Sequence, residues 1–148
     1  RRSALELIGG GVVTALLAGS FASVAHADAK MLAEAIKKAV GDGEIKEGKI
    51  TLDLPEIAEN GNTVPVGVSV ESPMTPDNYV KSVHIFAEKN PVPDVASIHF
   101  TPDSGVAKAA LRMRMAGTQN VVAVAEMSDG SLYTGKRLVK VTIGGCGG

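Results

Sequence analysis

Two periodicities of apolar residues divide most of the chain into predicted elements. Between residues 28 and 40 the apolar positions recur every three or four residues, which is the spacing of one face of an α-helix. These positions are Met31, Leu32, Ala35, Ile36 and Ala39. Asp28 is suited to cap the start of this helix, and Gly41 to follow its end. The pattern therefore predicts a helix from Asp28 to Val40.

Beyond Gly41 the period changes to two, which indicates strands with one buried and one solvated face. About seven such runs are present, separated by turn sequences rich in Asn, Pro, Gly and Asp. The predicted strands are residues 50–54, 64–70, 79–87, 95–100, 108–115, 120–127 and 138–143. Strands at this spacing predict a mainly β fold, an immunoglobulin-like antiparallel β-sandwich with an N-terminal helix, over residues 28–143. Residues 90–94 contain two prolines and are expected to be a loop or an edge segment.

The first 27 residues have a different pattern, that of an export signal. Arg1 and Arg2 precede a moderately apolar stretch, and Ala25-His26-Ala27 ends it as a cleavage site. The paired arginines and the glycine-diluted apolar region indicate that residues 1–27 are a signal peptide of the twin-arginine type. A membrane anchor is the alternative, but the glycines, Glu6 and the cleavage site argue against it. We expect a periplasmic protein that begins near Asp28 and has no membrane segment after cleavage.

Composition excludes several function classes. Acidic and basic residues nearly balance, with a formal charge of −1, and no basic block is interleaved with aromatic residues, so a nucleic-acid surface is not expected. Three histidines and one cysteine form no ligand cluster, so we expect no metal and no cofactor. His84 and His99 are expected to be structural. A single cysteine in an exported chain indicates either an intermolecular disulfide or a free reactive thiol.

That cysteine, Cys146, lies in a glycine-rich C-terminal tail, residues 144–148. Glycine flanks it on both sides, as Gly144, Gly145, Gly147 and Gly148. Such a segment has no side chains to bury, so we expect a flexible arm that reaches roughly 17 Å when fully extended. The flanking glycines would also allow the backbone to enter a narrow cleft. These features make Cys146 the candidate site for covalent attachment of a substrate.

Other roles for Cys146 are less favoured. A redox enzyme would be expected to show C-x-x-C and a βαβ pattern, and a catalytic nucleophile needs a neighbouring base. The terminal diglycine also resembles that of ubiquitin-like carriers, which hold sulfur as a thiocarboxylate, but that chemistry requires ATP and a smaller fold. An exported adaptor or binding module whose tail cysteine forms an intermolecular disulfide remains the alternative.

The chain resembles the SoxY family, the carrier subunits of the bacterial sulfur-oxidation (Sox) system. The resemblance lies in the tail Gly144-Gly145-Cys146-Gly147-Gly148, together with the β-rich body and the export signal. The resemblance implies a non-catalytic subunit that holds thiosulfate-derived thiosulfonate or persulfide groups on Cys146. It implies a SoxZ-like β-sandwich partner. It also implies a haem cytochrome pair, a manganese hydrolase and a sulfane dehydrogenase as the enzymes that act on the carried sulfur.

Three basic residues precede the tail. Lys136, Arg137 and Lys140 could attract an anionic adduct or an acidic partner. A solvated strand face is the favoured interpretation, because exposed charges are common on such faces.

Overall fold

The computed structural model describes the backbone of residues 21–145 and the side chains of residues 28–145. It contains one α-helix, nine strands and one turn of 3-10 helix within this range. The elements are α1 (Phe21–Val40), β1 (Ile45–Glu47), β2 (Ile50–Asp53), β3 (Ile57–Asn60), β4 (Val64–Val70), β5 (Val80–Ala87), β6 (Asp94–His99), η1 (Pro102–Ser104), β7 (Ala107–Met113), β8 (Gln119–Met127) and β9 (Leu132–Ile143).

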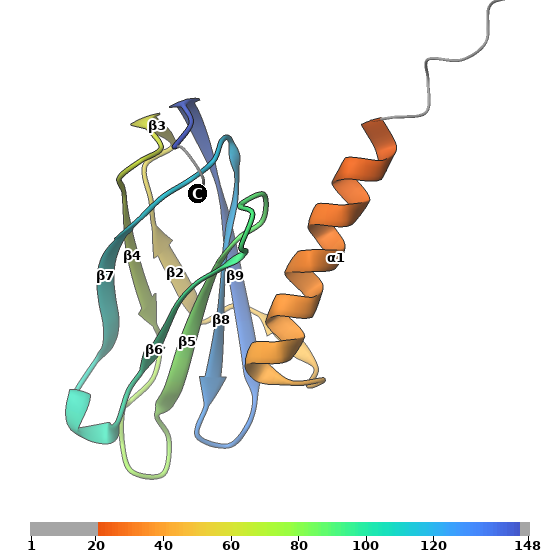
Figure 1. Ribbon diagram of the computed structural model, residues 1–148. Coiled ribbons are helices and arrows are strands. Elements are labelled where there is room, and N and C mark those ends of the chain that lie inside the picture. Colours follow the sequence, from red (N-terminus) through yellow and green to blue (C-terminus); the bar gives the residue numbers. More distant parts are fainter. Residues whose placement is uncertain (1–20, 146–148) are drawn as a thin grey trace, which may run out of the picture.

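The strands form two sheets that pack face to face, with α1 on the outside of one of them (Figure 1). The larger sheet has the order β1-β9-β8-β5-β6, and β3 also pairs with β9. The smaller sheet has the order β2-β4-β7 and is antiparallel. The predicted β-sandwich with an N-terminal helix is confirmed.

The core lies between the two sheets and follows from the period-two pattern. Along β4, Val64, Val66, Val68 and Val70 are buried and alternate with more exposed residues. The predicted alternation of residues 108–115 is likewise present, with Lys108 and Arg112 exposed and Met113 and Met115 buried. Alternation of this kind places one apolar face of each sheet in the interior.

A second apolar cluster lies on the outer face of the larger sheet, where α1 covers it. Phe86, Val122 and Val124 pack there against the apolar side of the helix. The helix residues in this cluster are Leu32, Ala35, Ile36, Ala39 and Val40. This second cluster explains why β5 and β8 are buried on both faces.

Two predicted boundaries are wrong by more than two residues, whereas the other strand ends differ by no more than two. The helix begins at Phe21, so Asp28 lies inside it and does not cap its start. The last strand begins at Leu132 and has 12 residues, six more than the predicted run 138–143.

Two short strands were not predicted, and they pair with β9 in parallel. β1 pairs with the beginning of β9 and β3 with its end. Between them, β2 crosses to the other sheet. At this crossing a side chain on Gly135 would press against Ile50, and the Arg137 guanidinium bonds to the Leu52 carbonyl. The sandwich is therefore not purely antiparallel, because the long β9 has room for two successive parallel neighbours.

Candidate functional site

The structure describes the tail only as far as Gly145. Cys146, Gly147 and Gly148 lie outside the described residues, so the predicted attachment residue is not placed. β9 carries the chain to the end of the sandwich where β3 ends and the β7–β8 connection turns (Figure 1). The groups that surround Gly144 and Gly145 therefore define the point from which the tail leaves the domain.

Three backbone hydrogen bonds join the root of the tail to two loops. The Gly61 N–H donates to the Ile143 carbonyl at 2.7 Å, and the Met115 N–H donates to the Gly61 carbonyl at 2.7 Å. The Gly145 N–H donates to the Met115 carbonyl at 2.9 Å. We call this arrangement of Gly61, Met115, Ile143 and Gly145 the tail clasp. It makes Gly145 a buried residue although it lies beyond the last strand.

Close approach of the backbones requires glycine at three positions here. A Cβ atom on Gly61 would overlap the Met115 carbonyl oxygen and lie 2.7 Å from the Gly145 nitrogen. A Cβ atom on Gly144 would overlap the Ala116 carbonyl oxygen, and one on Gly145 would lie 2.8 Å from the Gly61 carbonyl oxygen. The sequence suggested glycine at positions 144 and 145 for flexibility. In the structure, glycine is needed there because a Cβ atom would collide with a backbone carbonyl oxygen.

Two buried amide side chains hold the loop that contributes Met115 to the tail clasp. Asn90 Nδ2 donates to the Arg114 carbonyl at 2.9 Å, and Asn90 Oδ1 accepts from the Ala116 N–H at 3.0 Å. Gln119 Nε2 donates to Asn90 Oδ1 at 2.9 Å, and its Oε1 accepts from the Lys89 N–H at 2.7 Å.

Asn90 and Gln119 were not predicted as functional residues. Both look like ordinary polar residues beside a turn, so no local signal marks them. Their exposed fractions of 6% and 1% become apparent only when the loops are brought together.

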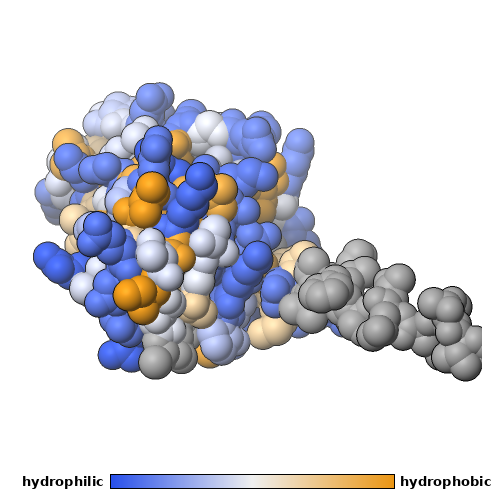
Figure 2. Space-filling model, turned by 90° about the horizontal axis from the view of Figure 1, so that it is seen from above, coloured by the Kyte–Doolittle hydropathy of each residue, from blue (hydrophilic) through white to orange (hydrophobic). Residues whose placement is uncertain are grey.

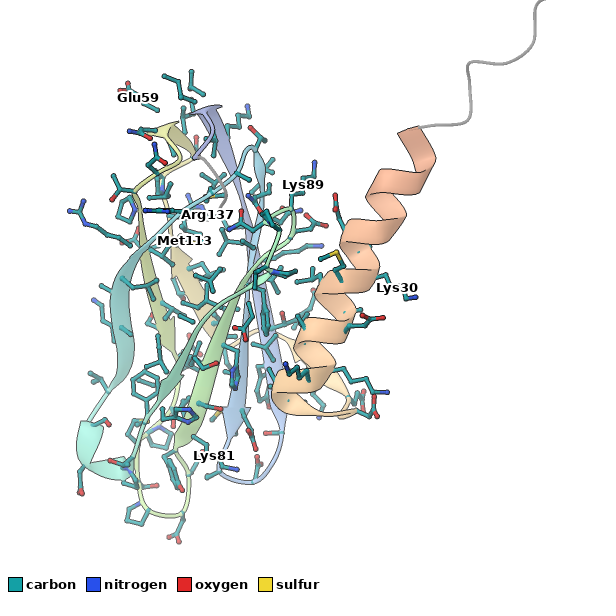
Figure 3. The ribbon with its side chains drawn as sticks, in the orientation of Figure 1. Lys30, Glu59, Lys81, Lys89, Met113 and Arg137 are labelled. Carbon is teal, nitrogen blue, oxygen red and sulfur yellow. The ribbon has the colours of Figure 1, made fainter. Side chains whose placement is uncertain are left out.

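The surface at this end is largely hydrophilic with separate hydrophobic patches (Figure 2). Ile57, Val92 and Ile143, three of the exposed large apolar side chains among the described residues, belong to segments that reach this end. Glu59 and Lys89 also project here, whereas Lys81 lies at the opposite end (Figure 3). The surface that surrounds the exit of the tail therefore combines isolated apolar side chains with charges of both signs.

The three basic residues before the tail lie on β9 and are exposed, as the favoured interpretation predicts. Arg137 also donates to the Leu52 carbonyl at 3.3 Å. A shallow groove beside it is lined by Glu56, Ile57, Arg137, Leu138 and Lys140.

His84 belongs to a polar cluster on the outer face of the larger sheet. Its Nδ1 lies 2.7 Å from Ser97 Oγ and its Nε2 lies 3.2 Å from Ser82 Oγ. Burial lowers the pKa of His84 below 6.5, although the nearby carboxylates of Asp94 and Glu126 oppose the shift. A buried, hydrogen-bonded and preferentially neutral imidazole fits the structural role expected for it.

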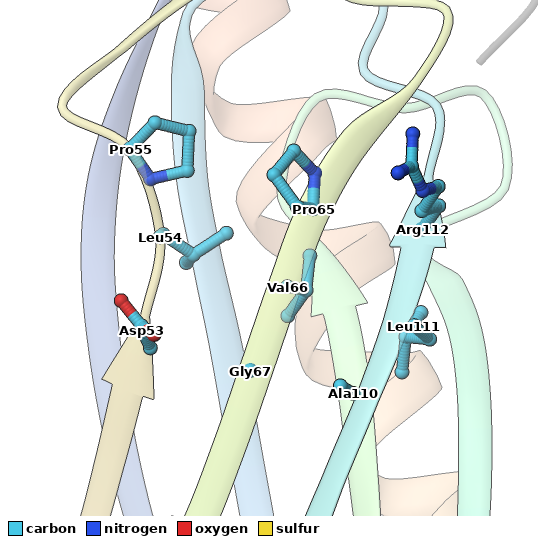
Figure 4. Close-up of a pocket in the computed structure, with 9 residues that line it drawn as sticks. All are labelled: Asp53, Leu54, Pro55, Pro65, Val66, Gly67, Ala110, Leu111 and Arg112. Carbon is cyan, nitrogen blue, oxygen red and sulfur yellow. The ribbon is translucent and has the colours of Figure 1, made fainter.

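A depression on the smaller sheet is lined by residues of β2, β4 and β7 and their ends (Figure 4). The depression forms where β2 ends, at Asp53 opposite Gly67. Gly67 and Ala110 are small and leave space between Asp53 and Arg112. The end of β2 also leaves one edge of β4 unpaired, which lets Pro65 lie in this strand without a lost hydrogen bond on that side. The lining contains neither histidine nor cysteine.

The described residues lack both a metal-ligand cluster and a membrane-spanning helix. They contain no group of three or more His, Cys, Asp or Glu side chains positioned to hold a metal ion. They also contain no helix with the length and apolar character needed to cross a membrane.

Comparisons with known proteins agree on one family. The model of the family "Sulfur oxidation protein SoxY" matches residues 36–146. The structure of the sulfur carrier protein SoxY from Chlorobium limicola f thiosulfatophilum is 40% identical over 78% of this chain and 99% of that chain, with a TM-score of 0.67. No match was found among curated proteins.

More distant structures share the fold alone. A superoxide reductase (neelaredoxin) from Ignicoccus hospitalis is 18% identical over 73% of this chain and 86% of that chain, with a TM-score of 0.57. One from Nanoarchaeum equitans is 14% identical over 65% of this chain and 100% of that chain, with a TM-score of 0.55. The family match over most of the chain and the 40% identity to a solved member carry the assignment: this chain belongs to the SoxY family of sulfur oxidation proteins.

Proposed function

We propose that this chain is a sulfur carrier that holds its cargo covalently on Cys146 and presents it to the enzymes of sulfur oxidation. The single observation that supports this most strongly is the family match, whose aligned region ends at Cys146 itself. The related solved structure is described as a sulfur carrier protein. Cys146 is also the only cysteine of the chain, so a thiol-bound cargo has one possible position.

The chemistry of the site favours a carrier over a catalyst. An ordinary thiol has a pKa of about 8.5 and needs a base or a positive charge nearby to become a strong nucleophile at neutral pH. Among the described residues, the groups hydrogen-bonded to the root of the tail are backbone amides and carbonyls, supported by the side-chain amides of Asn90 and Gln119, and none of these groups ionises. We therefore assign activation of the thiol to the enzymes that receive the tail.

Loading of thiosulfate onto Cys146 is an oxidation. Formation of the S–S bond between the thiol and thiosulfate gives a cysteine S-thiosulfonate and releases one proton and two electrons. A haem cytochrome pair would accept those electrons, a manganese hydrolase would remove sulfate by adding water, and a sulfane dehydrogenase would oxidise the remaining sulfur. Throughout these reactions the chain would act as the covalent carrier of the sulfur. It would do so in the periplasm, in a complex with a SoxZ-like subunit.

Intact-mass spectrometry of the protein from thiosulfate-grown cells tests the proposal. Sulfur-bearing adducts should appear on the wild-type chain, disappear after reduction, and be absent from Cys146→Ser. That variant should lose thiosulfate-dependent turnover in a reconstituted system. Its stability should change by no more than about 0.5 kcal/mol, the usual range for a substitution away from the core and from other structural features.

Two outcomes would contradict the proposal. Full turnover by Cys146→Ser would exclude Cys146 as the attachment point. A mass equal to two disulfide-linked chains, with no sulfur adduct, would favour the adaptor that uses its tail cysteine for an intermolecular disulfide.

A further inference from the structure

We infer that the tail clasp positions the carrier tail, and that Asn90 and Gln119 are positioning residues that act through it. This inference rests on the proposed function, because it concerns how the tail is presented to an enzyme. The observation that carries it is the set of three backbone hydrogen bonds among Gly61, Met115, Ile143 and Gly145.

The tail clasp determines how much of the tail can move away from the domain. With the Gly145–Met115 hydrogen bond in place, Gly145 is fixed against the domain, so the Cα atom of Cys146 can move only around a fixed point about 3.8 Å away, one trans peptide unit. With that bond broken and Gly144 released, the same atom can lie about 10 Å from the Cα atom of Ile143, the length of three extended residues. The tail is therefore short and held in one direction when the clasp is formed, and longer and free in direction when the clasp is released.

Asn90 acts on both sides of Met115. Its Nδ2 donates to the carbonyl of residue 114 and its Oδ1 accepts from the N–H of residue 116. Met115 supplies both its N–H and its carbonyl to the tail clasp, so Asn90 fixes the peptide units from which those two groups project. Gln119 in turn holds the Asn90 oxygen. A primary amide suits this position because the site uses one donor and one acceptor from the same side chain.

A clasped root should help the tail to enter an enzyme cleft. A segment that is already ordered loses less conformational entropy when it binds than one that must first be ordered. Release of the clasp should therefore raise the concentration of carrier needed for half-maximal loading. The maximal loading rate should stay the same, because the bond to Cys146 forms after the tail has entered.

Gly144→Ala is the variant that tests this most directly. Its new methyl group would overlap the Ala116 carbonyl oxygen, and the strain can be relieved by lifting the tail root away while β9 stays paired. Gly117→Ala is the matched control. Gly117 lies next to Ala116 in the loop that Gly144 approaches, and a Cβ atom on Gly117 meets nothing within 4 Å. Asn90→Ala is a second test variant, which removes the support of the loop without changing the tail.

Two measurements separate a positioning role from a structural one. The first is amide hydrogen exchange, in which the Gly145 N–H should exchange about tenfold faster in Gly144→Ala than in the control, as expected for the loss of one hydrogen bond. The N–H groups of the β5–β8 ladder should be unchanged. The second is the rate of Cys146 loading by the purified haem cytochrome pair with thiosulfate, for which Gly144→Ala and Asn90→Ala should raise KM several-fold at constant kcat.

Each outcome decides the inference. Identical exchange at Gly145 in Gly144→Ala and Gly117→Ala would show that the clasp is not formed in solution. Faster exchange with an unchanged KM would show that the clasp forms but does not position the tail. If the wild-type chain takes no adduct on Cys146, the carrier proposal itself fails, and the exchange measurement still reports on the clasp.

Discussion

Glycine has two physical uses in this chain, and they can be distinguished residue by residue. Gly41 and Gly130 have positive φ angles, which other residues adopt only with strain. Gly61 and Gly144 instead lie where a carbonyl oxygen approaches too closely to admit a Cβ atom. The second use is the one that builds the root of the tail, and it makes these positions intolerant of alanine for a reason unrelated to flexibility.

At the same scale, His84 makes the stability of the domain depend on pH. Because burial lowers the pKa of folded His84 below 6.5, the unfolded chain binds more protons in the interval between the two pKa values. The free energy of unfolding should therefore fall as the pH is lowered below 6.5, and level off below the folded-state pKa.

Urea denaturation between neutral and mildly acidic pH measures this dependence. In His84→Gln, which keeps a neutral polar side chain beside Ser97, the decrease in this pH interval should be smaller than in the wild type. An unchanged pH dependence in the variant would assign the effect to other groups.

Among the elements, α1 is the one most affected by the expected export. The structure has the helix beginning at Phe21, whereas the predicted cleavage falls between residues 27 and 28. All of the helix residues in the cluster against the sheet, from Leu32 to Val40, lie after that point. Cleavage would therefore shorten the helix from its N-terminal end and leave the packing of residues 32–40 on Phe86 and Val122 in place.

We expect the mature protein from the native host to begin at Asp28 and to keep α1 docked. N-terminal sequencing identifies the first residue, and hydrogen exchange of the amides of residues 35–40 reports on the docked helix. A mature chain that still contains Arg1 would contradict export by a cleaved signal. Loss of protection in residues 35–40 after cleavage would show that the earlier turns of the helix are needed for docking.

For the whole molecule, the open question is which surface meets a partner subunit. The proposed carrier function requires a tail cysteine that stays available for loading, so a stable subunit contact should use an apolar sheet or helix surface and not a bond to Cys146. Ile57 and Leu138, exposed on the paired strands β3 and β9, are candidate contact residues.

Coexpression with a SoxZ-like subunit should give a heterodimer that elutes as one species under reducing conditions. Cys146→Ser should elute identically, because the contact does not involve the thiol. Separate elution of the two chains at micromolar concentration would argue against the predicted assembly.

Local pattern was sufficient for the class of fold and for the candidate attachment residue. The alternation along residues 64–70 and 108–115 reflects one buried face per strand, and that period is a property of the backbone itself. Cys146 could be singled out because it is the only thiol and has glycine on both sides. Neither inference required knowledge of which segments meet in space.

Tertiary structure decided the features that depend on contacts between distant segments. β1 and β3 are three and four residues long and do not alternate apolar with polar residues, and they exist because β9 offers them an edge. Three loops converge at one end of the sandwich. Only this convergence buries Asn90 and Gln119 and brings Gly61 close to Gly145. The sequence alone identified Cys146 as the candidate attachment residue, whereas the fold decided where the tail begins, because a backbone hydrogen bond carries no mark in the side chains that surround it.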